Sequence, residues 1–168
     1  MGRVKVASAI LMALILGAAG TSWGAVHATA MVTVAAPLAS SAQLTISPNV
    51  INFPDANPDT VPTIAATQNP VSVTANAQTG GGRTVTLGVL AQGDLVSGGN
   101  TIAINNVTWT ATGSGFRNGT MNKTTSQLAG QWTGPGSRTG TFSYSLKNSW
   151  SYATGSYTQT VIYTLIAP

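Results

Sequence analysis

The sequence predicts an all-β fold, a sandwich or barrel of about seven to nine short strands, and three observations lead to this prediction. Apolar and polar residues alternate in many short runs. This is the period of a strand, whose side chains point alternately to two faces. Glycine and proline separate the runs at intervals of roughly 8–12 residues. After the first 30 residues, no window of eleven or more residues repeats its apolar positions every 3.6 residues, so amphipathic helices are not expected.

The composition fits one globular domain and argues against a nucleic-acid partner. The chain has 168 residues, of which 6% are charged, well below the usual quarter. Abundant valine, isoleucine and threonine argue against disorder. Seven basic residues, less Arg3 and Lys5 near the start, leave five against three aspartates, a net charge of +2 without a basic stripe. No nucleic-acid partner is therefore expected. The chain has no cysteine, which excludes a disulfide framework.

Residues 1–28 are predicted to be a secretory signal peptide. Arg3 and Lys5 form a positive start, and residues 6–19 form an apolar run too short for an ordinary membrane span. We expect export from a bacterial cell to its surface or the medium, with no membrane contact after cleavage. The alternative is an uncleaved anchor. Small residues precede three possible cleavage points, which follow Gly24, Ala28 and Ala30.

Residues 29–41 are predicted to form an N-terminal strand and a flexible linker. Pro37, Ser40 and Ser41 loosen the connection to the rest of the chain. An alternating apolar strand on a flexible joint can add to the exposed edge of a sheet. Three alternatives are open: pairing with its own sheet, donation to a neighbouring molecule, or no role beyond the end of the leader. The strand-donation candidates are the apolar residues at every second position, Val26, Ala28, Ala30, Val32 and Val34.

Residues 42–168 are predicted to be the β-domain. The stretch 54–69 should be a loop, because three prolines block a central strand there. The glycines at 80–82 should turn the chain between 71–77 and 84–90, giving a hairpin. The runs from which strands are expected are 44–46, 50–53, 71–77, 84–90, 101–104, 107–111, 119–121, 126–128, 131–133, 141–146 and 157–166.

The sequence offers little material for catalysis, so no enzyme activity and no cofactor are expected. Nucleophilic triads need an imidazole or a thiol. The only histidine is His27, at or before the expected cleavage, and cysteine is absent. Glycosidase chemistry needs two facing carboxylates, and Asp55, Asp59 and Asp94 are the only acids.

One segment partly matches a calcium-binding loop. Asp55, Asn57 and Asp59 stand at the first three ligand positions of an EF-hand. Thr60 then replaces the required glycine, and Ala66 replaces the bidentate glutamate. Aspartate, asparagine and proline are also ordinary turn residues. No metal site is expected, and these three residues remain the one weak candidate.

Two aromatic residues are predicted to lie in a loop. Trp150 and Tyr152 belong to a polar stretch between the last two runs. Exposed rings can stack on sugars or anchor a protein partner. The alternative is that the loop folds over the open end of the sandwich. Four aromatic residues in the expected strands are assigned to the core, namely Trp109, Tyr144, Tyr157 and Tyr163.

Two stretches resemble a known group of proteins. Residues 43–53, QLTISPNVINF, and 155–165, GSYTQTVIYTL, are similar to those that open and close spore coat protein U-like and fimbrial pilin-like proteins. The resemblance implies an Ig-like sandwich without enzyme activity that assembles by lending a strand to a neighbour. Gly155 stands fourteen places from the end, as in pilins of the chaperone–usher type. Ala167 replaces their penultimate aromatic residue, and their usual disulfide is absent.

The predicted function is that of an exported, non-enzymatic structural or adhesive protein of the cell surface or extracellular space. Its expected partners are itself or other surface proteins, through strand pairing. The alternative is a carbohydrate-binding module in which Trp150 and Tyr152 hold a polysaccharide.

Overall fold

The computed structural model describes residues 32–168. The predicted signal peptide lies outside the described residues, as do Val26, Ala28 and Ala30. The chain divides into two units, Met1–Ala36 and Pro37–Pro168. The described residues are all-β, with one three-residue 3-10 turn and no α-helix. No helix among them is long and apolar enough to cross a membrane.

The larger sheet is wholly antiparallel. Its long central strand is β10, Gly136–Lys147, which pairs with β3 along its first part and with β7 along its second. The short strand β2, Thr63–Ala65, pairs with the end of β10. The strand order is β1-β3-β10-β7-β8. The remaining bounds are Ser41–Ser47 for β1, Val71–Gln78 for β3, Val107–Thr112 for β7 and Gly119–Thr120 for β8.

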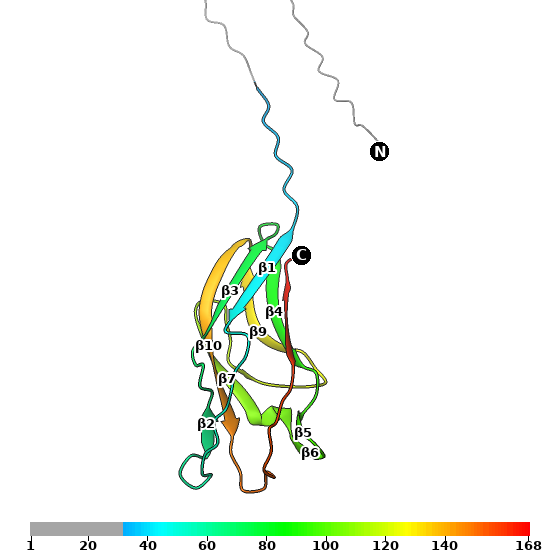
Figure 1. Cartoon of the computed structure of the whole chain (residues 1–168). Helices are drawn as coiled ribbons and strands as arrows, with labels where there is room; N and C mark the ends of the chain where they lie inside the picture. Colours follow the sequence, from blue (N-terminus) through cyan, green and yellow to red (C-terminus); the bar gives the residue numbers. More distant parts are fainter. Residues whose placement is uncertain (1–31) are drawn as a thin grey trace, which may run out of the picture. The chain divides into compact units, whose positions relative to one another are not determined.

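A second antiparallel sheet has the order β11-β4-β9. It is formed by Val161–Ile166 (β11), Thr84–Ala91 (β4) and Gln127–Thr133 (β9). Figure 1 shows β11 ending beside the start of β1, with the connection from β10 to β11 at the opposite end of the domain. Between β4 and β7 the chain forms a small hairpin of Leu95–Ser97 (β5) and Asn100–Ile102 (β6), followed by the 3-10 turn Ile104–Asn106.

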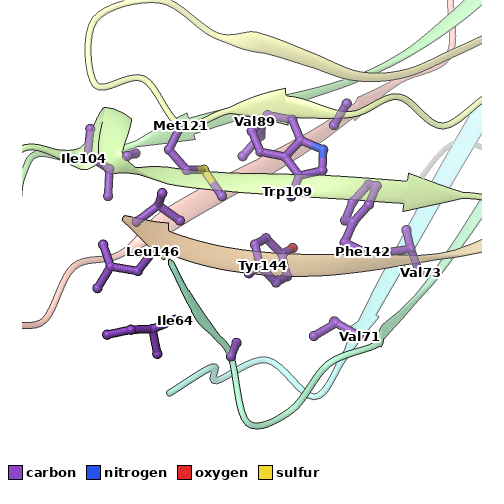
Figure 2. Close-up of a cluster of buried hydrophobic side chains, with 14 of the residues drawn as sticks. Ile64, Val71, Val73, Val89, Ile104, Trp109, Met121, Phe142, Tyr144 and Leu146 are labelled. Atoms are coloured by element: carbon purple, nitrogen blue, oxygen red, sulfur yellow. The ribbon is translucent and has the colours of Figure 1, made fainter. Parts of the chain in front are cut away.

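The two sheets bury a shared apolar core, as in a β-sandwich. Inward residues of both sheets, such as Val73 and Leu87, are fully buried in the same cluster. Figure 2 shows Trp109, Phe142 and Tyr144 within this cluster. Phe142 contacts both other rings edge-on, with centroids 6.4 and 6.3 Å away. Edge-to-face contacts of this kind stabilise aromatic pairs beyond their buried area.

The predicted hairpin at the triple glycine is wrong. Strands β3 and β4 lie in different sheets, so residues 79–83 carry the chain across the sandwich. Both edges of β3 are already paired, one with β1 and one with β10. Alternation along each strand could not distinguish pairing within a sheet from packing between sheets, because both bury one face.

The described residues form eleven strands rather than the predicted seven to nine, and several strand positions differ from the prediction. Residues 50–53 form no strand, since Asn52 bonds instead to Thr67 and the Gln68 side chain. Their alternation reflects half-buried side chains that pack on the core. The stretch predicted as a loop contains β2, a strand at the sheet edge whose Ile64 is buried. The last strand begins at Val161, and Thr158 makes only an isolated bridge to Val96.

Substituting Gly119 tests how tightly the core is packed around Trp109. A Cβ at position 119 would overlap the Trp109 ring, whose Nε1 donates to the Arg117 carbonyl at 2.8 Å. We expect Gly119→Ala to lower the free energy of unfolding by about 1–3 kcal/mol, the usual range for overpacking. Urea unfolding measures this loss. The control is Gly99→Ala, where a Cβ meets nothing within 4 Å; equal stability of the two variants would contradict the packing.

Candidate functional site

The candidate site is an unpaired edge on one side of the domain. Strand β1 is the terminal strand of one sheet, and β11 is the terminal strand of the other. Each pairs with a partner on one side only, β1 with β3 and β11 with β4. Backbone N–H and C=O groups on such an outer edge can pair with another strand.

The side chains that β1 and β11 direct inward are less covered than those of the central strands. Val73, Leu87 and Phe142 have no exposed surface. The corresponding positions on the terminal strands are only half-buried, although they pack against the same core. The open edge is defined as these five residues, Leu44, Ile46, Val161, Tyr163 and Leu165. It is an apolar strip with backbone hydrogen-bonding groups beside it.

The two strands of the open edge run in opposite directions. Ser40, just before β1, donates its hydroxyl to the Pro168 carbonyl at 3.3 Å, and the Thr79 hydroxyl also donates to that carbonyl. Strand β1 therefore begins where β11 ends, as Figure 1 shows. We call this the Pro168 end of the domain.

A tyrosine pair ties the open edge to the core. The hydroxyls of Tyr163 on β11 and Tyr144 on β10 are 2.7 Å apart, and the Tyr163 ring stacks on Phe142 with centroids 5.9 Å apart. Burial raises the pKa of Tyr144 to about 12. Burial, aided by the nearby Tyr144 hydroxyl, raises the pKa of Tyr163 as well. The inner part of the open edge is therefore a low-dielectric environment that disfavours charge.

The part of the predicted donor strand that the structure describes is exposed. Residues 32–40 belong to no helix or strand. Val32, Val34 and Leu38 are 84%, 88% and 79% exposed. Leu38 continues the alternation of the two valines, whereas Pro37 falls on the other face. We call residues 26–36 the arm.

The two loop aromatics have different environments. Trp150 is 68% exposed, so it does not cover the core. Its Nε1 donates to Asp59 Oδ1 at 2.9 Å, which joins two loops that are far apart in sequence. Tyr152 is half-buried against the core, and burial raises its pKa. Trp150 is therefore the ring that remains available for contact.

The weak metal candidates take part in ordinary loop contacts. Asn57 Oδ1 accepts from the Asp59 backbone N–H at 2.9 Å, and Asp59 accepts from Trp150. Among the described residues, no group of three or more histidine, cysteine, aspartate or glutamate side chains could hold a metal ion. The one ion pair among them joins Lys123 to Asp94 at 2.5 Å.

Comparison with known proteins adds no functional information. No protein-family model matches the chain, and neither a curated protein nor a solved structure matches it. The case for a function therefore depends on geometry. Sequence reasoning assigned Tyr163 to the core and missed its place at an open edge. The alternation in β11 could not reveal this, since it is the same beside an empty edge as beside a paired one.

The hydroxyls of Tyr163 and Tyr144 should contribute to stability as a coupled pair, so removing one of them should leave the other unsatisfied. Tyr163→Phe leaves the buried Tyr144 hydroxyl without its partner, which costs about 1–3 kcal/mol. The double change Tyr144→Phe and Tyr163→Phe removes both groups, so its loss should be smaller than the sum of the two single losses. Chemical unfolding of the three variants measures the coupling.

High pH provides the control for this pair. The Tyr144 pKa lies near 12 in the folded protein and near 10 when unperturbed. The contribution of Tyr144 to the free energy of unfolding is therefore fully present below pH 10. It falls as the pH rises toward 12, by about 1.4 kcal/mol per pH unit. The double phenylalanine variant should show a flatter decline. The pair would not be coupled and buried if the double variant lost the sum of the two single losses and its stability declined with pH as steeply as that of the parent.

Proposed function

We propose that this protein is an exported structural protein of the cell surface or extracellular space, and that it assembles by β-strand addition. In this proposal the arm of one copy pairs with the open edge of another. The observation that supports it most is that β1 and β11 each have one unpaired edge, and that their inward apolar side chains are only half-buried. In strand addition the backbone of such an edge supplies affinity through hydrogen bonds, and the side-chain positions supply specificity.

The strand order supports an Ig-like assignment with one strand missing. An immunoglobulin-type sandwich has four strands in the order A-B-E-D facing a sheet of strands C, F and G. The order β1-β3-β10-β7 corresponds to the first sheet, and β4 with β11 corresponds to C and F, whereas β8 and β9 have no counterpart among these seven strands. The position of strand G, beyond β11, is empty among the described residues. A seventh strand from another molecule would complete the sandwich.

For pairing with β11, chain direction favours a second molecule over self-pairing; a self-paired arm could run antiparallel only to β1. Within one molecule the arm joins β1 at the Pro168 end, so an arm along its own open edge would run parallel to β11. It would also have to reverse over residues 35–40, which contain no glycine, asparagine or aspartate for a tight hairpin. An arm from another copy can run antiparallel to β11, as in every other ladder of the described sheets. Antiparallel pairing is also slightly more stable per residue.

The chemistry of the arm suits the open edge. Its alternate positions are valine and alanine, and Thr33 lies between them. Burying one exposed valine stabilises a complex by about 1.5–3 kcal/mol before ordering costs. The mostly buried environment beside Tyr163 accepts apolar side chains and disfavours charged ones.

A charge on the inward face of the arm should prevent assembly. In a mature chain that starts near Ala25, Val32→Asp would place a carboxylate against the open edge, which costs several kcal/mol unless it is paired. We expect the parent to form oligomers or filaments and the variant to remain a folded monomer. Size-exclusion chromatography with light scattering measures the masses. The control is Thr33→Asp on the opposite face, which should still assemble; equal behaviour of both variants would count against strand addition.

Moving the arm to the other terminus should complete the domain within one molecule. Residues 26–36, deleted from the start and attached after Pro168 through a glycine-containing turn, can fold back antiparallel to β11. We expect a monomer with a higher melting temperature, because the added strand covers the open edge. Calorimetry measures the melting temperature. The control is the same rearranged chain with aspartate in place of the two moved valines, Val32 and Val34. An equal melting temperature would refute the proposed complementarity.

A further inference from the structure

The exposed Trp150 lies on a loop that is fixed in place by side-chain hydrogen bonds. Asn148 Nδ2 donates to the Ala56 and Val61 carbonyls at 2.9 and 3.0 Å, and Asp59 accepts from the Trp150 indole. The loop 54–62 and the loop after β10 are thus joined. A large ring that is both exposed and held loses little side-chain entropy on contact, which is typical of binding hot spots.

Antiparallel strand addition would bring a second copy to this loop. The start of the arm would lie near the Pro168 end of the acceptor, and the end of the arm would emerge beyond the beginning of β11. Figure 1 shows the loop between β10 and β11 at that end, opposite the C-terminus. The arm therefore leaves the acceptor on the side where Trp150 is exposed.

The linker is too short to keep the two domains apart. Pro37 has no N–H for a ladder bond, so pairing should end near Ala36. Residues 37–40 then separate the paired arm from β1 of the donor. Four residues span at most about 14 Å. The Pro168 end of the donor must therefore lie against the Trp150 side of the acceptor.

The two surfaces that would meet have complementary features. The donor presents the turn 80–83 at its Pro168 end, where Arg83 is exposed and forms no salt bridge with any described residue. The acceptor presents Trp150 with Asp55 and Asp59, which are exposed and likewise form none. Lys147 at the end of β10 offsets part of that negative charge. A guanidinium can stack on an indole ring and bond to a carboxylate at the same time.

We infer that Trp150 and Asp59 of one copy contact the Arg83 turn of the next copy in a strand-linked chain. This inference rests on the proposed function, because strand addition sets the distance between the domains. The contact holds neighbouring domains at a defined angle, so the short linker does not act as a free hinge.

Engineered cysteines test the contact directly, since the parent chain has none. Ser151→Cys beside Trp150 is combined with Gly81→Cys in the turn, where a Cβ meets nothing within 4 Å. After mild oxidation, the assembled mature chain should give a ladder of disulfide-linked copies. The matched control combines Ser151→Cys with Gly99→Cys. Gly99 lies in the turn between β5 and β6, at the same end of the domain as the loop between β10 and β11 (Figure 1), so this pair should give no ladder.

Quenching of Trp150 fluorescence by iodide provides a second measurement. Trp109 and Trp132 are buried, so in a mature chain starting near Ala25 the quenching reports Trp150. Assembly should reduce it several-fold, and Arg83→Ala should restore much of it while assembly continues.

The outcomes separate the two ideas. Oligomers without a ladder and with unchanged quenching would overturn the contact and leave strand addition standing. No oligomers at all would overturn both. The remaining outcome is that a polysaccharide protects Trp150 from iodide quenching in the monomeric Val32→Asp variant. If assembly of the parent chain gave no such protection, the ring would be assigned to sugar binding and the contact would be overturned.

Discussion

The structure depends on the packing of aromatic rings around Phe142, which has no exposed surface. Trp109 and Tyr144 contact it from the larger sheet, Phe116 from the connection after β7, and Tyr163 from the second sheet. These contacts hold the two sheets together without a disulfide or a buried charge among the described residues. Apolar packing is enough for a domain of this size.

The same cluster explains why a domain with an incomplete edge can remain folded. Tyr163 stacks on Phe142 and bonds to Tyr144, so β11 is anchored from within even though no strand covers its outer edge among the described residues. The open edge retains exposed apolar surface, which is a liability for a solitary protein. In an assembling protein it becomes the binding site, and the unfavourable exposure of the free subunit becomes part of the driving force for assembly.

The proposed assembly has a direction, because the arm and the open edge are different surfaces. Contacts of this heterologous kind produce open chains unless the rotation between subunits happens to close a ring. The sparse charges fit such an arrangement. Asp59 bonds to Trp150, whereas the turn that contains Arg83 is joined to Pro168 through Thr79, so successive copies would bring opposite charges together.

Local patterns in the sequence determined the all-β class and most strand positions, since alternation and turn residues act over a few neighbours. Trp150 was also correctly placed in a loop. Only the tertiary structure decided that β3 and β4 lie in separate sheets, that Asp59 holds Trp150, and that Tyr163 borders an open edge. Each of these depends on residues far apart in the chain, and a strand carries the same alternation whether or not another strand lies beside it.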